Sequence, residues 1–381
     1  MEASKSRLQI LSHRAAFYLT IVAIAGGGIT FTAWILANAG VVTATERLVA
    51  VLVITCPHAL GLAVPLVASI STTMAARNGL LVRQRIALEG ARNIDTVLFD
   101  KTGTLTEGKF KLTKVTNDEV LTLAAAVEKE SEHPIARAVI EAAEKQRLVI
   151  PFAKNYNRIP GIGAEAEVEG MRIFVGHKGG DEIVVEKNGE KIGELAVDDT
   201  IREEAKEALE SLRERGLKLA MITGDSEEVA KRVAGELGID EYFARVRPED
   251  KVNKVKILQG KGQKVAMVGD GVNDAPALTQ ADVGIAIGAG TNVAIESAGI
   301  ILVRNDPRDI VKIINLSRLT YRKMIQNLFW ATGYNVIAIP LAAGALAWKG
   351  IILEPALAAV LMSASTVIVA FNAMLLRRQK I

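Results

Sequence analysis

The 381-residue sequence has a single cysteine, Cys56, so no disulfide can form within the chain. Its formal net charge of +3 is too small to indicate nucleic-acid binding, and no repeat or low-complexity run occurs. Half of the residues are nevertheless hydrophobic, the mean hydropathy is +0.25, and 23% of the residues are charged. One soluble domain rarely combines these values, so we expect apolar blocks to be separated from charged ones.

Four apolar segments are long enough to cross a bilayer as helices. They are residues 15–37, 48–76, 327–346 and 351–376. Between the second and third segments lies a charged block with no candidate span. The sequence therefore predicts an α-helical bundle of four spanning helices in a lipid bilayer, flanking one large soluble insertion.

Basic residues predict which side of the membrane the insertion occupies. Those that flank it are Arg77, Arg83, Arg85, Lys312, Arg318, Arg322 and Lys323, and the chain ends in a basic tail. The opposite loops hold only Arg47 and Lys349, each with a glutamate nearby. By the positive-inside rule the insertion is expected to be cytoplasmic. We expect the membrane itself to be the plasma membrane of a prokaryote.

The insertion alternates apolar strands with amphipathic helices, the pattern of a doubly wound parallel α/β sheet. Strands are expected at 96–99, 217–222 and 264–268, each running into a polar turn with a carboxylate. Ligands bind at the carboxyl edge of such sheets, so these acids should converge there. Residues 107–197 instead read as helices followed by short alternating strands, which predicts an inserted α+β domain.

Asp100 ends the first of these strands, where a buried carboxylate is costly without a cationic partner or a chemical role. Lys101, Thr102 and Gly103 follow it, and a cation, hydroxyls and a flexible backbone suit a phosphoryl group. Aspartate can itself be the nucleophile and form an aspartyl phosphate. The sequence therefore makes Asp100 the candidate nucleophile of a phosphoryl-transfer site.

Further polar residues at the strand ends complete this candidate site. The set is Asp100, Lys101, Thr102, Thr223, Gly224, Asp225, Lys251, Asp270, Asn273 and Asp274. Clustered carboxylates repel, so a divalent cation is expected, and oxygen ligands favour Mg²⁺. Lys251 can balance phosphate charge. Plain surface turns are the alternative for any one Gly-Asp pair, but all the turns in this order at strand ends favour a site.

These motifs resemble those of the P-type ATPases. The matching stretches are Asp100-Lys101-Thr102-Gly103-Thr104-Leu105-Thr106, Thr223-Gly224-Asp225 and Gly269-Asp270-Gly271-Val272-Asn273-Asp274-Ala275-Pro276. The resemblance implies that Asp100 is phosphorylated and that Asp100 and Asp270 hold Mg²⁺. Thr102, Thr223 and Lys251 would contact the transferred phosphoryl group. The resemblance also implies that the phosphorylation domain has a haloacid-dehalogenase-like fold.

The inserted domain resembles the nucleotide-binding domain of the heavy-metal branch of this family. Ser131-Glu132-His133-Pro134 is similar to its nucleotide-binding signature, and Gly161-Ile162-Gly163 to its glycine pair. The resemblance implies that ATP contacts Glu128, His133, Gly161 and Gly163. A His-Pro pair alone is as consistent with a helix cap. His177 stands where many relatives carry asparagine.

A candidate transport site lies in the second apolar segment, at Cys56-Pro57-His58. Proline removes a backbone donor and opens a kink, and a thiol beside an imidazole suits a soft or borderline metal. A packing cysteine and a hydrogen-bonded histidine are the alternative. The motif resembles the copper-exporting subgroup, which implies copper, as Cu⁺ or Cu²⁺, with silver second and zinc less favoured. Further positions that match this subgroup are Tyr334, Asn335, Met362 and Thr366.

The resemblance covers nearly all of the chain but only the later part of a typical family member. The sequence has no Thr-Gly-Glu, the loop with which the family's actuator domain clears the phosphate, and no Cys-x-x-Cys. We therefore expect autophosphorylation from ATP without efficient turnover, unless a separate chain supplies the actuator domain. The expected divisions are a lead-in (1–14), two membrane helices (15–76), the phosphorylation domain (77–106 and 198–323), the nucleotide-binding domain (107–197) and two last membrane helices (324–381).

Two other functions remain open from the sequence. A membrane-anchored phosphatase of the haloacid-dehalogenase-like fold would hydrolyse small phosphate esters and would need neither ATP nor Cys56. A non-catalytic membrane subunit would bind nucleotide and pair with a separate actuator chain. The nucleotide-like insertion and the membrane Cys-Pro-His disfavour the phosphatase.

Overall fold

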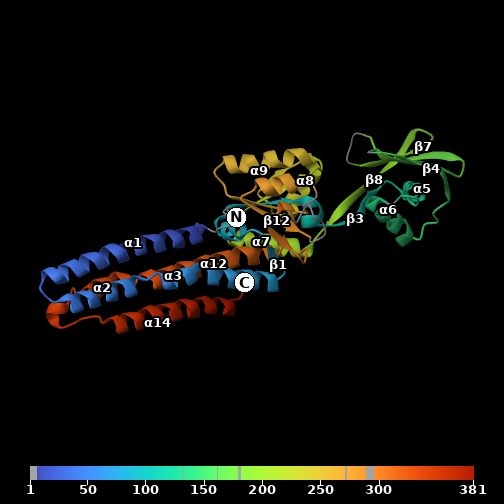
Figure 1. The fold of residues 1–381 in the computed structure, drawn as a ribbon. Coiled ribbons are helices and arrows are strands. Elements are labelled where there is room, and N and C mark those ends of the chain that lie inside the picture. Colours follow the sequence, from blue (N-terminus) through green and yellow to red (C-terminus); the bar gives the residue numbers. More distant parts are fainter. Residues whose placement is uncertain (1–6, 132, 161, 179–181, 271–272, 289–295) are drawn as a thin grey trace.

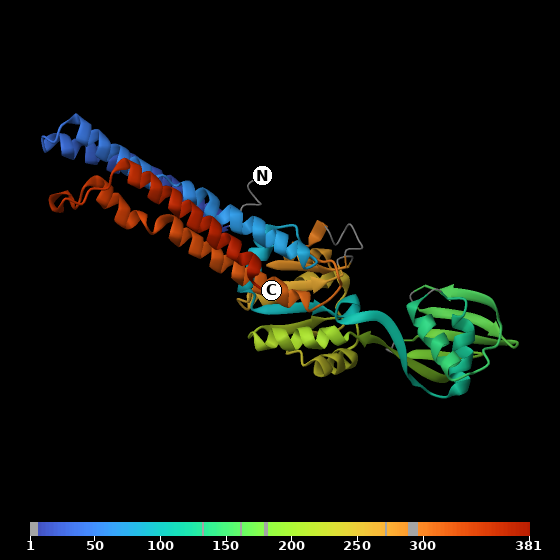
Figure 2. The same cartoon turned by 90° about the horizontal axis from the view of Figure 1, so that it is seen from below.

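The computed structural model describes residues 7–131, 133–160, 162–178, 182–270, 273–288 and 296–381. Figures 1 and 2 show a bundle of long helices at one end, a seven-stranded sheet with its helices in the middle, and a six-stranded sheet at the other end. This is the multi-domain arrangement that the alternation of apolar and charged blocks predicts.

The bundle consists of apolar helices from both ends of the chain. They are α1 (Arg7–Leu36), α2 (Val41–Thr55), α3 (His58–Arg77), α12 (Asp309–Thr332), α13 (Asn335–Ala343) and α14 (Pro355–Met374). Among the described residues, three helical stretches are long and apolar enough to cross a membrane: Ile10–Leu36, Val41–Arg77 and Pro355–Arg378. The second is interrupted at Cys56 and Pro57, between α2 and α3, where the sequence predicts a kink.

The predicted third span, residues 327–346, is not one helix. α12 ends at Thr332 and α13 begins at Asn335. Between them the backbone tightens into three-residue turns, with Val336 N donating to Gly333 O at 3.4 Å and Ile337 N to Tyr334 O at 3.2 Å. The count of four spanning helices therefore stays a prediction.

The seven-stranded sheet has the order β1-β13-β12-β11-β2-β9-β10. Its strands are β1 (Leu80–Val82), β2 (Thr96–Asp100), β9 (Lys218–Ile222), β10 (Glu241–Phe243), β11 (Val265–Gly269), β12 (Val283–Ile287) and β13 (Ile300–Leu302). All neighbours are parallel except β1 and β13. This sheet, with helices on both faces, confirms the predicted doubly wound α/β fold.

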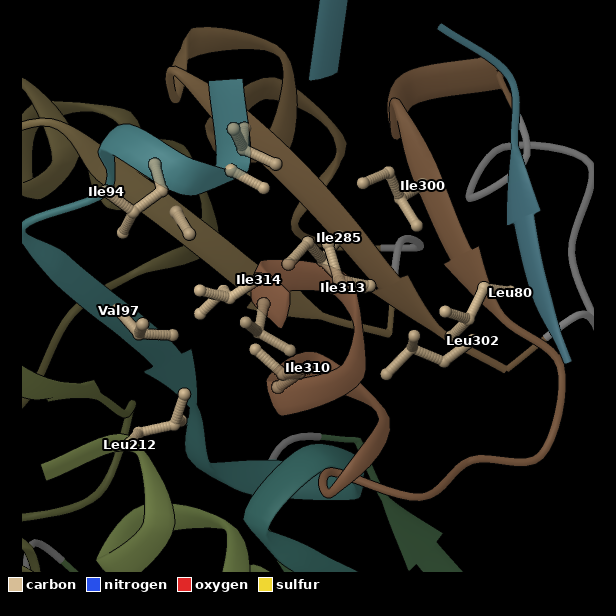
Figure 3. Packing of buried hydrophobic residues seen from close by; sticks show 14 of the residues in the cluster. Leu80, Ile94, Val97, Leu212, Ile285, Ile300, Leu302, Ile310, Ile313 and Ile314 are labelled. Atoms are coloured by element: carbon tan, nitrogen blue, oxygen red, sulfur yellow. The ribbon is translucent and has the colours of Figure 1, made fainter. Parts of the chain in front are cut away.

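Helices cover both faces of this sheet, which is why β2 is buried along its whole length. On one face lie α7 (Glu203–Glu214), α8 (Glu227–Leu237) and the start of α12; on the other lie α9 (Lys251–Gly260) and α10 (Ala275–Gln280). Figure 3 shows Val97 and Ile285 of the sheet facing Ile310, Ile313 and Ile314 of α12. The α12 helix therefore begins in the core of the sheet and continues into the membrane bundle.

The six-stranded sheet is antiparallel, with the order β3-β8-β7-β6-β5-β4. Its strands are β3 (Thr106–Val115), β4 (Ala153–Ile159), β5 (Gly163–Val168), β6 (Met171–His177), β7 (Ile183–Lys187) and β8 (Glu190–Ile201). The helices α5 (Asp118–Glu128) and α6 (Pro134–Lys145) belong to the same body (Figure 1). β3 and β8 run between this sheet and the seven-stranded one (Figures 1 and 2), so the two bodies are joined by two strands.

Candidate functional site

The carboxyl edge of the seven-stranded sheet brings together most of the predicted acids. Asp100 ends β2 and is only 6% exposed. Because β2 pairs in parallel with β9 on one side and β11 on the other, the turns after these two strands lie beside it. Gly103, in the loop after Asp100, has a φ of +74° and would place a Cβ 4.0 Å from Asp270 Oδ2. The loop therefore passes close to the Asp270 carboxylate.

Lys251 joins two of the carboxylates directly. Its Nζ lies 2.7 Å from Asp100 Oδ1 and 2.6 Å from Asp274 Oδ1. All three residues are buried. The Asp270 backbone N–H donates to Asp274 Oδ2 at 3.2 Å. A Cβ on Gly269 would lie 2.1 Å from that same oxygen, so only glycine leaves room for Asp274 here.

The charges of this cluster are not balanced by Lys251 alone. Burial and the neighbouring Asp274 raise the pKa of Asp100 to about 7, although Lys251 opposes the shift. Burial also raises the pKa of Asp274, against the effect of Lys251. Burial lowers the pKa of Lys251, but the two carboxylates outweigh it and raise that pKa overall. The cluster therefore favours a further positive charge, either a proton or a metal cation.

A second ion pair lies on the other side of Asp100. Lys101, which is buried, pairs with Asp225 in the turn after β9. The Asp225 N–H donates to Thr223 Oγ1 at 3.1 Å, which fixes the buried Thr223 hydroxyl in the same turn. Exposed residues of the predicted set lie at the rim: Thr102, Gly224 and Asn273. Two lysines and three turns thus converge on one strand end.

Two residues that the sequence did not single out hold the loop after Asp100. The Arg202 guanidinium donates to Thr106 O at 2.9 Å and to Gly103 O at 3.3 Å. The Thr106 hydroxyl bonds Asp199 Oδ2 at 2.5 Å and accepts from Gly103 N at 3.2 Å. Asp199 lies near the end of β8 and Arg202 directly follows that strand, about 100 residues away in the sequence, and no local pattern there indicates this contact.

The six-stranded sheet carries a separate cavity of about 300 Å³. Its lining includes the predicted Glu128, His133 and Gly163; the predicted Gly161 lies outside the described residues. Further lining residues are Ser131, Tyr156, Arg158, Ile162, Val175, Gly176 and His177. Burial raises the pKa of Glu128, although a hydrogen bond with Ser131 opposes the rise. The cavity therefore combines apolar walls with a few polar groups, as small-molecule sites do.

A cross-strand pair of glycines forms part of this lining. Gly163 of β5 lies opposite Gly176 of β6 in the antiparallel register. A Cβ on Gly163 would lie 2.5 Å from Gly176 Cα, and one on Gly176 would lie 2.3 Å from Ile162 O. Neither position leaves room for a side chain. Gly176 was not assigned a role from the sequence, because only strand pairing puts it beside Gly163.

The predicted transport residues lie around the break between α2 and α3. The Cys56 and His58 side chains are exposed on the bundle. Tyr334 Oη donates to Ile54 O at 3.4 Å, just before Cys56. Asn335 is 3% exposed, and neither polar atom of its amide has a hydrogen-bond partner among the residues that the structure describes. On α14, Thr366 Oγ1 bonds Met362 O at 3.3 Å. Within the described ranges, no group of three or more His, Cys, Asp or Glu side chains could hold a metal ion.

Known proteins share both the sheet and the bundle. The profile of the haloacid dehalogenase-like hydrolases matches residues 94–282, which contain Asp100, Lys251 and Asp274. The copper-exporting P-type ATPase B of Archaeoglobus fulgidus is 52% identical over 99% of this chain and 58% of its own length. A probable copper-transporting P-type ATPase B of Staphylococcus epidermidis is 44% identical over 98% of this chain and 60% of its own.

Solved structures give the same relationship. A zinc-transporting PIB-type ATPase in its E2.Pi state superposes with a TM-score of 0.81 at 34% identity, over 98% of this chain and 64% of that one. The structure of the catalytic domain of the CPx-ATPase CopB-B, solved in work on its conformational changes upon nucleotide binding, superposes with a TM-score of 0.59 at 38% identity. The match covers 64% of this chain and 98% of that domain.

The fold and the buried aspartate at its sheet edge define a haloacid dehalogenase-like hydrolase. Because the match extends over the whole of a CPx-ATPase catalytic domain and also into the membrane helices, the chain belongs to the heavy-metal P-type ATPases. It spans somewhat more than half the length of the curated relatives named above.

Proposed function

We propose that the chain takes part in ATP-driven transport of a heavy-metal cation across a membrane, through an aspartyl phosphate on Asp100. The observation that carries this proposal is the buried cluster of Asp100, Lys251 and Asp274 at the carboxyl edge of the sheet. It supplies a nucleophile, a second carboxylate and a fixed cation that lies within hydrogen-bond distance of both. The copper- and zinc-transporting relatives support the transport function.

The phosphoryl transfer follows from the positions of these groups. A carboxylate oxygen of Asp100 forms a bond to the γ-phosphorus of ATP, and the bond from that phosphorus to the bridging oxygen of the β-phosphate breaks, which releases ADP. Lys251, 2.7 Å from Asp100 Oδ1, offsets the negative charge brought together at the sheet edge. The hydroxyls of Thr102 and Thr223 are proposed to donate to the transferred phosphoryl oxygens. The neighbouring residues Gly224, Asp225, Asn273 and Asp274 are proposed to hold the turns of this catalytic site in place.

The donor set at this edge fits Mg²⁺. The side chains offer carboxylate oxygens, which this ion prefers, and their charge exceeds that of the lysines beside them. We propose that Asp100 and Asp270 hold the ion, which when bound neutralises charge on the phosphoryl group. The close passage of Gly103 beside Asp270 supports this assignment.

We propose that the cavity on the six-stranded sheet binds the adenosine part of ATP. Glu128, His133, Gly161 and Gly163 are the proposed contacts. Gly163 and Gly176 both line this cavity, so a flat ring bound there can lie close to the backbone of their strands. The nucleotide binding named for the similar CPx-ATPase catalytic domain supports a nucleotide site within the matching part of this chain. His177 and Arg158 also line the cavity.

Copper, as Cu⁺ or Cu²⁺, is the proposed cargo, with silver second. The names of the two copper-transporting relatives support this choice over zinc. The proposed ligands lie at the break in the second span and on the last two membrane helices: Cys56, His58, Tyr334, Asn335, Met362 and Thr366. The unpartnered amide of the buried Asn335 supports a ligand at this level. The relatives come from an archaeon and a bacterium, which supports the plasma membrane of a prokaryote with cytoplasmic catalytic domains.

The 381 residues contain no Thr-Gly-Glu sequence. We propose that these residues carry the phosphorylation step, and that an actuator domain, on a separate chain in a split pump, would complete the cycle.

Incubation with γ-labelled ATP and Mg²⁺ tests the proposal. We expect hydroxylamine-sensitive label on the wild-type chain and none on Asp100→Asn; label that survives Asp100→Asn would contradict the nucleophile assignment. Repeating the assay with Cu⁺, Cu²⁺, Ag⁺ and Zn²⁺, with and without Cys56→Ala, tests the cargo. A membrane-anchored phosphatase would instead hydrolyse p-nitrophenyl phosphate with no dependence on ATP or on Cys56.

A further inference from the structure

The membrane bundle contains a chain of side-chain hydrogen bonds that the proposed metal ligands do not include. Asn327 of α12 is fully buried, and its Nδ2 donates to Ala63 O of α3 at 3.1 Å. Its Oδ1 accepts from Asn372 Nδ2 of α14 at 2.7 Å. Asn372 Oδ1 in turn accepts from Lys323 Nζ at 2.9 Å. We call these four groups the asparagine bridge; it ties three helices together.

The asparagine bridge lies next to the proposed metal ligands on each of these helices. Ala63 follows His58 by five residues, Asn372 follows Thr366 by six, and Asn327 precedes Tyr334 by seven. At 1.5 Å per residue the first two separations are about 8–9 Å along α3 and α14; Tyr334 lies just beyond the end of α12, which carries Asn327. All three lie on the side of the ligands from which α3 and α12 continue to the seven-stranded sheet. The bridge is therefore a polar layer between the ligands and the catalytic body.

Asn327 and Asn335, on either side of the break at Gly333, differ in one respect. Both are buried, and each polar atom of the Asn327 amide has a partner on another helix. Within the described part of the chain, neither atom of the Asn335 amide has one. A buried amide without partners is costly, which suits a group that binds a ligand. A fully paired amide suits a fixed contact, because separating the helices would leave its donor and acceptor unpaired in an apolar bundle.

The helix that carries Asn327 also reaches the catalytic sheet. Ile310, Ile313 and Ile314 of α12 pack in the core beside Val97 of β2, the strand that ends in Asp100 (Figure 3). α12 is continuous from Asp309 to Thr332. The Asn327 amide is thus fixed to the catalytic sheet through one helix and to α3 and α14 through hydrogen bonds.

We propose that Asn327 and Asn372 are positioning residues that hold α3, α12 and α14 in the register in which their ligands bind the metal. The inference rests on the proposed function only in taking the residues around Cys-Pro-His as the metal site. Loss of the bridge should weaken metal binding without changing the number of ions bound, because no proposed ligand is removed.

The test measures Cu⁺ affinity of the full chain in lipid nanodiscs, by competition with a chromophoric chelator and without ATP. Asn327→Leu and Asn372→Leu keep the branching of the side chain and remove the amide. Each should weaken Cu⁺ binding about three- to tenfold, the range expected for interhelical hydrogen bonds in membranes. Because the two amides share one hydrogen bond, the loss of Cu⁺ affinity in the double variant should be smaller than the sum of the losses in the two single variants. Thr332→Val is the matched control, since that hydroxyl bonds Leu328 O of its own helix at 2.8 Å.

Three results would overturn the proposal: additive losses in the double variant, unchanged affinity in both single variants, or an equal loss in Thr332→Val. Nucleotide affinity, measured in parallel, should stay at the wild-type value in every variant; a fall in both affinities indicates general misfolding and also counts against a positioning role. If Asn327→Leu does not fold, Asn372→Leu and Asn372→Ala carry the test. Cu⁺ binding that Cys56→Ala leaves intact would contradict the proposed function instead.

Discussion

At the scale of single residues, the site depends on a few buried charges and on glycines that leave space. Lys251 is the clearest case, because it contacts two buried carboxylates. The sequence could identify Asp100, Lys251 and Asp274, since each belongs to a short motif. It could not identify Asp199, Arg202 or Gly176, because their contacts depend on strand pairing across the chain.

Replacing Lys251 tests the charge balance. Lys251→Gln leaves Asp100 and Asp274 without their cation, so we expect the free energy of unfolding of the seven-stranded sheet to fall by about 3 kcal/mol at pH 7.5. The loss should be smaller at pH 5.5, where the raised pKa of Asp100 allows it to take up a proton. Hydrogen exchange of β2 and β11 measures this. Lys256→Gln, on the exposed side of the same helix, should change neither value.

The burial of Glu128 predicts how the stability of the protein changes with pH. Burial raises its pKa in the folded state, so the ionised form destabilises the fold at pH values above the unfolded pKa, and the protonated form does not. Glu128→Gln should therefore raise the unfolding temperature at pH 7, and the gain should vanish as the pH falls to about 4. Scanning calorimetry from pH 4 to 8 checks this, with the exposed Glu130→Gln as control. A gain that persists at pH 4 would contradict the burial argument.

Gly176 tests the cavity lining. Its Cβ would lie 2.3 Å from Ile162 O, so Gly176→Ala must displace one of two paired strands. We expect nucleotide affinity to fall at least about tenfold, since 1.4 kcal/mol of strain is enough for that. Titration with a fluorescent nucleotide measures the effect, and near-normal binding would exclude the close packing described here.

At the scale of elements, the sequence predicts the strands of the parallel sheet well, because each is a short apolar run followed by a polar turn. It predicts the third membrane span less well. The apolar run of residues 327–346 contains no charge, so its composition predicts one continuous helix. The structure instead has tighter backbone turns after Gly333, which composition alone does not predict. The start of α12 in the soluble core is likewise hidden, because its apolar face reads as an ordinary amphipathic helix.

Helix α8 offers a test of local stability. Gly235 lies near its end, and a Cβ there would meet nothing within 4 Å. Gly235→Ala should therefore stabilise the protein by about 0.5–1 kcal/mol through helix propensity. Gly238, which caps the same helix with a left-handed φ of +63°, is the matched contrast. Gly238→Ala should destabilise the protein, because a side chain is strained at that backbone angle. Thermal unfolding measures both effects: the unfolding temperature should rise in Gly235→Ala and fall in Gly238→Ala.

At the scale of the whole molecule, the orientation in the membrane follows from charges near the helix ends. In a Cys56→Ser background, cysteines at Asn38 and Trp348 should react with an impermeant maleimide from one side of the membrane, and a cysteine at the exposed Val149 from the other. The predicted four spans require Asn38 and Trp348 to share a side. Labelling of these two positions from opposite sides would rule out that topology.

The two strands β3 and β8 that join the sheets also set how ATP is delivered. Because the proposed adenosine cavity and Asp100 belong to different bodies, ATP bound as proposed would present its γ-phosphate to Asp100 as an intramolecular reactant. The strand pair has irregular register at two places, between Thr106 and Phe110 and between Leu112 and Lys114, where a sheet bends most readily. Its stiffness therefore fixes the effective concentration of γ-phosphate at Asp100, so a substitution in these strands could change the phosphorylation rate without touching either site.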